Sequence, residues 1–197
     1  MSTNILQAFR MALLTFTISL IISFLFGSSL TLWVSILALV VVIFAGIIFD
    51  IIGTAVTAAT ETPFHAMASD KVKGSRQAIY LVRHADQVAN LCNDVVGDIS
   101  GTIGGVLIAG VVLGLIHSHP SLKEKEQFIN PFAIATVAAV TVAGKAFGKS
   151  LAIDRANDIV FAVGKLLAVF KINLDFNPKR GKKKSKYKSN LRKVKKG

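Results

Sequence analysis

Two acids occur along a stretch of the chain that is otherwise apolar. The stretch covers residues 31 to about 59, its only ionisable side chain is Asp50, and Glu61 follows just beyond its end. A helix needs roughly 20 apolar residues to cross a hydrocarbon core about 30 Å thick, so this segment is long enough to span a membrane. Carboxylates at that depth are costly unless they meet water, a cation or a hydrogen-bond donor. The chemistry of this chain therefore depends on what Asp50 and Glu61 face.

Hydroxyl groups extend these acids into a polar stripe. Positions 50, 54, 57 and 61 have the spacing of residues on one face of a helix. Hard cations such as Mg²⁺ bind oxygen ligands and keep several waters, and carboxylates with hydroxyls supply those ligands. Two alternatives stay open: Glu61 can cap a helix or pair with Lys71 or Lys73 at the interface, and the threonine hydroxyls can bond to their own backbone. The candidate ligands here are Asp50, Thr54, Thr57, Thr60 and Glu61.

A second set of oxygen ligands precedes the next apolar segment. Asn90, Asp94 and Asp98 share a helix face by their spacing, and Asn93 lies one turn after Asn90. If these residues face the first stripe, the two sets would together form an oxygen-rich cation site. The alternative is that Asn93 or Asp94 caps the start of a helix. The sequence has no Ser/His/Asp arrangement, paired catalytic acids or phosphate-binding glycine loop, so we do not expect an enzyme.

Composition predicts an all-α integral membrane protein. Of the 197 residues 52% are hydrophobic and only 17% are charged, and eleven of the 23 Lys and Arg residues lie between positions 179 and 196, which leaves a nearly neutral body. We expect four spans, at about 5–26, 32–56, 99–116 and 132–147. With both termini in the cytoplasm, every basic residue except Lys123 and Lys125 lies on the cytoplasmic side of the inner (cell) membrane, as the positive-inside rule requires. The single cysteine, Cys92, excludes an intrachain disulfide framework.

Two segments beside the spans have apolar residues at helical spacing but too many charges to cross a membrane. We therefore expect amphipathic juxtamembrane helices at about residues 63–92 and 149–172. Pro63 suits a first helical turn, and Gly74 is expected to interrupt the first segment. Together with the spans they form a transmembrane domain over residues 1–176.

Residues 177–197 have almost no apolar residues and are expected to be a disordered basic tail. In a membrane protein such a tail attracts anionic lipids. Nucleic acid is not expected, because aromatic side chains for base stacking are scarce there. The tail residues assigned to the membrane surface are Lys179, Arg180, Lys182, Lys183 and Lys184.

Glycines spaced four residues apart occur in the later spans. Such pairs allow close approach of helices, either within one subunit or across a homodimer, and both alternatives stay open. The pairs are Gly101/Gly105, Gly110/Gly114 and Gly144/Gly148.

Three stretches carry a resemblance to a known family. Thr57-Ala58-Ala59-Thr60-Glu61-Thr62 is similar to a small-polar-Glu motif at the end of a span. Cys92-Asn93-Asp94-Val95-Val96-Gly97 is similar to a Gly-Asn-x-x-x-Asn entry to the next span. Gly144-Lys145-Ala146-Phe147-Gly148-Lys149-Ser150-Leu151-Ala152 is similar to Gly-Glu-x-x-Pro-Lys-Ser-Leu-Ala. In order and spacing, over about residues 47–170, they resemble the transmembrane domain of the CorB/CorC and cyclin M (CNNM) magnesium transporters.

The resemblance implies three family spans with juxtamembrane helices, a homodimer, and a cation held in a cavity that faces the cytoplasm. It implies Mg²⁺ transport, usually efflux, with Na⁺ as the coupling ion and with Thr60, Glu61 and Asn93 at the cation. The sequence departs from the family where Gly97 replaces the second Asn, Lys145 replaces the acid and Gly148 replaces the Pro. We expect an additional span at the N-terminus, and we do not expect the family's CBS and CorC-type domains.

These observations predict a divalent cation transporter. Its metal ligands would be Glu61, Asn93, Asp94, Thr60, Thr57 and Asp50. The alternative is a non-transporting membrane scaffold or regulator that keeps the fold, which the Lys145 departure and the lost Asn favour.

Overall fold

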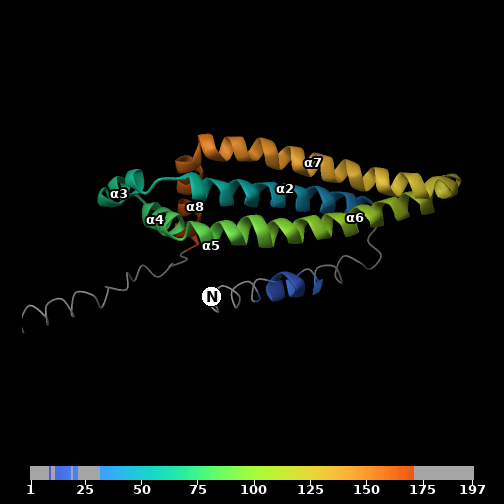
Figure 1. Cartoon of the computed structure of the whole chain (residues 1–197), viewed down its shortest axis with the longest axis horizontal. Helices are drawn as coiled ribbons and strands as arrows, with labels where there is room; N and C mark the ends of the chain where they lie inside the picture. Colours follow the sequence, from blue (N-terminus) through green and yellow to red (C-terminus); the bar gives the residue numbers. More distant parts are fainter. Residues whose placement is uncertain (1–8, 10–11, 19, 22–31, 171–197) are drawn as a thin grey trace, which may run out of the picture.

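The described part of the chain consists of helices joined by short turns and contains no strand. The computed structural model describes residue 9 and residues 12–18, 20–21 and 32–170. Three long helices run side by side along the molecule (Figure 1): α2 (Leu32–Ala58), α6 (Gly97–Ser118) and α7 (Glu126–Asp154). The all-α prediction is confirmed for these residues.

Three helical stretches are long and apolar enough to cross a membrane, which indicates a membrane protein. They are Leu32–Ala58, Ala85–Ser118 and Pro120–Asp154, and they contain the second, third and fourth predicted spans. Much of the first predicted span, residues 5–26, lies outside the described residues. The residues of this span that are described, 9, 12–18 and 20–21, are helical. Large apolar side chains such as Trp33, Phe132 and Phe147 point outward and are at least 75% exposed, as on a surface that faces lipid.

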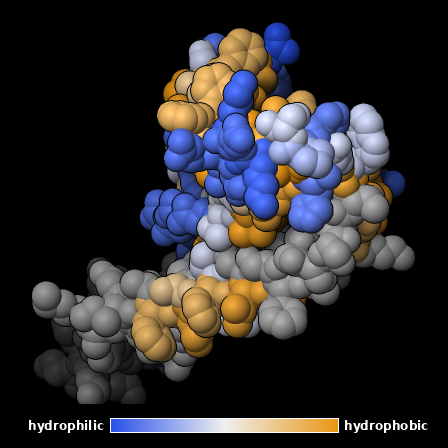
Figure 2. Space-filling model, turned by 90° about the vertical axis from the view of Figure 1, so that its right-hand side faces the viewer, coloured by the Kyte–Doolittle hydropathy of each residue, from blue (hydrophilic) through white to orange (hydrophobic). Residues whose placement is uncertain are grey.

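The α6–α7 connection forms a polar end of the bundle. Its 3-10 helix η2 (Pro120–Lys125) begins with a proline, which suits the first turn of a helix. Figure 2 looks onto this end and shows hydrophilic residues gathered among hydrophobic ones. The composition matches a membrane–water boundary, where apolar helices end and charged residues begin.

Four shorter helices gather at the opposite end of the bundle (Figure 1): α3 (Thr62–Ser69), α4 (Ser75–Arg83), α5 (Ala85–Ala89) and α8 (Ala156–Val169). As expected, Pro63 lies in the first turn of α3, and Gly74, with a φ of 93°, separates α3 from α4. The last helix begins at Ala156 rather than near Lys149, because α7 continues to Asp154.

The glycines near the end of α7 are contact points and not helix breaks. A Cβ on Gly144 would lie 2.5 Å from Ile47 Cδ1, and a Cβ on Gly148 would lie 2.7 Å from Ile51 Cγ1. The missing side chains leave room for Ile47 and Ile51 at this helix contact, and α7 stays helical beyond the predicted end of its span. The Gly144/Gly148 pair therefore packs α7 against α2 within one subunit.

Two apolar clusters hold the helices together. The first joins α2 to the short helices at the end of the bundle, where Val56, Phe64 and Val160 are fully buried. The second packs α2 against α6 around Leu39 and Leu107. Because α2 belongs to both clusters, its polar residues lie between packed elements and not in a loop.

Candidate functional site

Asp50 is the one charged side chain that is buried among the described residues, at 4% exposure. It lies on α2, and its Oδ2 has no hydrogen-bond partner in the described part of the chain. The nearest opposite charge is Lys149 of α7, whose Nζ lies 3.8 Å from Asp50 Oδ2. That distance is too long for a hydrogen bond, so the pairing is electrostatic and one carboxylate oxygen stays available.

Asn93 faces the same part of α2 from a different element. It lies within η1 (Asn90–Val96), a π-helix between α5 and α6, and its Oδ1 is also buried without a hydrogen-bond partner. A Cβ on Gly53 would overlap Asn93 Oδ1 and lie 2.8 Å from Asn93 Cγ. Since Gly53 follows Asp50 by about one turn of α2, Asn93 packs on α2 one turn beyond the buried acid.

The π-helix decides which polar residues face inward. π-turns are rare, and they often occur at functional sites. Here Asn93 packs against α2, whereas Asn90, Asp94 and Asp98, which were expected to line one face, are all exposed. Asp94 therefore does not join Asp50 and Asn93. No sequence signal that we recognise predicts this π-helix.

Helix α7 brings two ammonium groups to the same region. Lys149 approaches Asp50, and Lys145, one turn earlier, has its Nζ 3.4 Å from the position of a Cβ on Gly97. Lys145 is partly buried and forms no ion pair with any acid of the described residues. Lys145 departs from the family motif, whereas Lys149 matches it and was not predicted to pair with Asp50. The i, i+4 spacing of the two lysines was the available signal.

We call this group the buried junction, which consists of Asp50, Gly53, Asn93, Lys145 and Lys149. It joins α2, η1 and α7 near the end of the bundle where the short helices lie.

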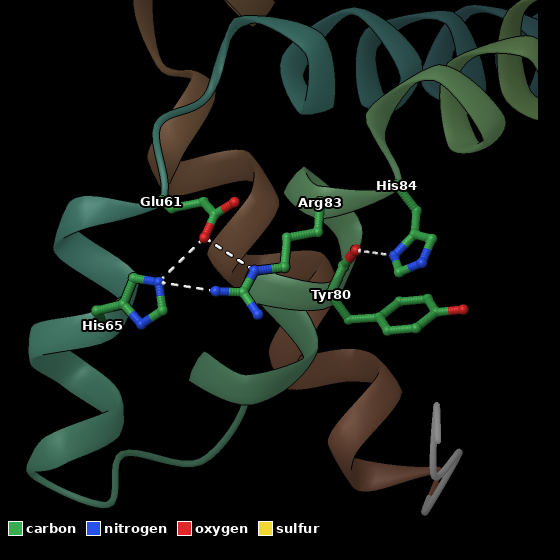
Figure 3. A network of polar contacts seen from close by, with 5 residues as sticks. All are labelled: Glu61, His65, Tyr80, Arg83 and His84. Atoms are coloured by element: carbon green, nitrogen blue, oxygen red, sulfur yellow. Dashed lines mark hydrogen bonds and ion pairs between the residues drawn. The ribbon is translucent and has the colours of Figure 1, made fainter. Parts of the chain in front are cut away.

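Glu61 lies apart from the buried junction because α2 ends at Ala58. Its Oε2 accepts hydrogen bonds from His65 Nε2 and Arg83 Nε, each at 3.0 Å (Figure 3). Chiefly the hydrogen bond from His65, and then the hydrogen bond and charge of Arg83, hold the pKa of Glu61 below its usual value. Glu61 precedes α3 and Arg83 ends α4, so this exposed ion-pair cluster (Glu61, His65 and Arg83) fastens the two helices together.

Tyr80 and His84, which lie beside this cluster, contact each other. Tyr80 and His84 stack with their centroids 4.1 Å apart, and His84 Nδ1 donates to the Tyr80 carbonyl oxygen at 2.9 Å (Figure 3). Glu61 had been expected to pair with Lys71 or Lys73 if it was interfacial. Its partners are instead His65, four residues later on α3, and Arg83, which the folding of α4 back toward α3 brings close.

The remaining predicted ligands bond to protein. The Thr57 hydroxyl donates to the Thr54 carbonyl oxygen at 2.8 Å, and the exposed Thr60 donates its backbone N–H to Asn157 Oδ1 of α8 at 3.0 Å. Among the described residues no three His, Cys, Asp or Glu side chains gather closely enough to hold a metal ion. The structure thus places Asn93 against α2 at Gly53, one turn from Asp50, and leaves Glu61, Thr57, Thr60 and Asp94 elsewhere. The predicted tail residues, from Lys179 to Lys184, lie outside the described residues.

In comparisons with known proteins, no family model matches the chain, and no curated protein or solved structure matches it. The resemblance to the CorB/CorC and cyclin M transporters therefore stays a prediction from three short motifs.

Proposed function

We propose that this chain is a membrane transporter for a divalent cation, most simply Mg²⁺, and that Asp50 is its principal ligand. Three buried oxygens of the described residues lack hydrogen-bond partners, and the observation that carries the proposal is that two of them, Asp50 Oδ2 and Asn93 Oδ1, lie on α2 and the η1 segment packed against it. The third, Asn130 Oδ1, lies near the start of α7. Buried polar atoms nearly always have partners, so two unsatisfied oxygens on facing elements favour a missing ligand. Carboxylate and amide oxygens are ligands of hard cations, and retained waters would complete the coordination of Mg²⁺.

Lys149 gives the proposed site a resident counter-ion. Its side chain is 53% exposed, whereas that of Asp50 is 5% exposed, so the lysine can withdraw toward water on its flexible stem while the acid cannot. An entering cation would compete with the ammonium group for the same carboxylate. Exchange of one positive charge for another would keep Asp50 compensated at each stage, which lowers the cost of a buried charge.

A non-transporting scaffold or regulator is the second candidate, and the two lysines favour it. Lys149 places a positive charge 3.8 Å from the Asp50 carboxylate, and Lys145 adds a second one turn earlier on α7; both oppose the approach of a divalent cation. In that case Asp50 and Lys149 would serve only as a pair that fixes α2 against α7.

We also propose that the chain forms a homodimer and that its basic tail attracts anionic lipids. For the dimer the support is a set of glycines on α6, Gly101, Gly105 and Gly110, where an added Cβ would meet nothing within 4 Å. Such open small residues leave room for close approach of another helix. Crosslinking of the full chain in lipid vesicles tests the dimer.

The deciding experiment is Mg²⁺ flux into proteoliposomes that contain a fluorescent indicator, with and without a Na⁺ gradient. Three proteins are compared: wild type, Asp50→Asn and Glu61→Gln. Flux that Asp50→Asn abolishes and Glu61→Gln retains supports the proposal and its ligand. Flux lost only in Glu61→Gln returns the site to Glu61. If folded wild-type protein carries no flux, the scaffold function replaces transport.

A further inference from the structure

A basic groove lies at the end of the bundle where α3, α4 and α8 meet. It has a volume of about 780 Å³, and its walls are the turn between α3 and α4 and the last turns of α8. Four cationic side chains line it: Lys71, Lys73, Arg76 and Lys165. It is separate from the buried junction and shares no residue with it.

Two glycines that are 90 positions apart in the sequence shape the groove. A Cβ on Gly74 would lie 2.7 Å from the backbone nitrogen of Lys165, and a Cβ on Gly164 would lie 2.6 Å from the carbonyl oxygen of Gly74. Gly74 also has a φ of 93°, and Lys71, in the same turn, has a φ of 56°. Left-handed backbone is rare for a residue with a side chain, so this turn is held by its surroundings. The contact brings Lys165 to the other three cations.

The four cations have no acidic partner within the described residues. No ion pair involves Lys71, Lys73 or Arg76, and the one recorded contact of Lys165 Nζ is with the Phe161 ring, 4.4 Å from its centroid. The start of α4 adds the partial positive charge of a helix N-terminus to the same space. Like charges collected in this way favour an anion that neutralises them.

The rim of the groove is apolar. Val72 and Val169 are 38% and 76% exposed, and Ala168 lines the wall between them. The groove also lies just beyond the ends of α2 and α7, two of the helices that can span a membrane. Positive charge beside exposed aliphatic groups at this level matches a phospholipid, which joins an anionic phosphate to acyl chains.

We propose that this groove binds the headgroup of an anionic phospholipid. Lys71, Lys73, Arg76 and Lys165 contact the phosphate, and the acyl chains run past Val72 and Val169. The site is independent of cation transport and distinct from lipid attraction by the tail. A nucleic acid fits less well, because no aromatic side chain lines the groove for base stacking.

The test is native mass spectrometry of the full chain in detergent, titrated with phosphatidylglycerol or with phosphatidylcholine of the same acyl chains. The groove variant is Lys71→Gln/Lys73→Gln/Arg76→Gln. The matched control is Lys123→Gln/Lys125→Gln/Arg155→Gln, which removes the same charge from exposed side chains outside both the groove and the tail. Wild type and control should bind phosphatidylglycerol in preference to phosphatidylcholine. The groove variant should bind phosphatidylglycerol at least about tenfold more weakly than wild type does.

Three results would overturn the proposal. Equal weakening in both variants would mean that overall charge, and not the groove, attracts the lipid. Unchanged binding by the groove variant would place the lipid elsewhere. Displacement of the lipid by inorganic phosphate at equal concentration would make the groove a site for soluble phosphate. Circular dichroism of each variant checks that the helices are retained.

Discussion

The buried junction and the exposed ion-pair cluster both join a carboxylate to cationic side chains, but in opposite surroundings. Asp50 is 4% exposed and has one oxygen without a hydrogen bond. The Glu61 side chain is 36% exposed, and its Oε2 accepts two hydrogen bonds of 3.0 Å. A satisfied surface ion pair contributes little to stability, whereas an ionisable residue inside a membrane is costly and usually functional.

The difference shows that the burial and the hydrogen bonds of an acid indicate a functional role better than its presence in a motif. Glu61 stands in the stretch that resembles a transporter motif, yet its hydrogen bonds to His65 and Arg83 account for it structurally. Asp50 stands in no such stretch, but its oxygen and that of Asn93 remain unsatisfied. We therefore place the candidate cation site at Asp50.

The largest expected effect comes from separating the members of the buried pair. Lys149→Met removes the one cation that pairs with Asp50 in the described residues and should lower the stability of the folded state by about 3 kcal/mol. Asp50→Asn should cost less, because the half-exposed Lys149 can turn to water. The double variant should recover most of the loss. Thermal unfolding of all three proteins in detergent measures this, and simple additivity of the two changes would contradict a direct pairing.

A smaller effect is expected where α2 meets η1. Gly53→Ala places a Cβ on Asn93 and should destabilise the protein by about 1–3 kcal/mol through overpacking. Gly104→Ala is the matched control, because its added Cβ would meet only Leu39 Cδ1, at an ordinary contact distance of 3.9 Å. The control should gain up to about 1 kcal/mol from better helix propensity. Equal unfolding temperatures for the two variants would show that Asn93 does not pack closely on Gly53.

The exposed cluster should tolerate substitution. Glu61→Gln removes the charge that Arg83 contacts, and because these side chains are substantially exposed the cost should stay below about 1 kcal/mol. Asp86→Asn is a suitable control, since Asp86 is an exposed acid of α5. Thermal unfolding of both variants gives the comparison. A loss as large as that of Lys149→Met would mean that the cluster, and not the junction, dominates stability.

The smallest effect is a pH dependence of the contact between α3 and α4. The pKa of Glu61 is lowered from 4.5 in the folded state, so its stabilising contribution is complete above that value. The contribution is lost as the pH falls through the lowered folded-state pKa, when protonation removes the charge that His65 and Arg83 contact. Unfolding temperatures between pH 7 and pH 3 should therefore fall more for wild type than for Glu61→Gln. Parallel curves for the two proteins would contradict this.

Local sequence patterns predicted much of this fold. Long apolar runs predicted the helices of three spans. The fixed φ of Pro63 predicted where α3 begins, and the conformational freedom of Gly74 predicted where α3 separates from α4. These features depend on residues within a few positions of one another, so they can be recognised without knowing which segments pack against each other. The end of α7 was misjudged for the same reason, because Gly148 looks like a break until Ile51 is seen against it.

Long-range packing fixed what local patterns leave open. A spacing of four places Asn90, Asp94 and Asp98 on one face, but contacts with α2 and the π-helix made Asn93 the inward residue. The approach of Lys149 to Asp50 joins residues 99 positions apart, and the end of α2 at Ala58 removed Glu61 from the stripe. The sequence alone identified the acids and the helices that hold them. Which acid is buried, and which is already satisfied, depends on contacts between distant segments, and those exist only in the folded chain.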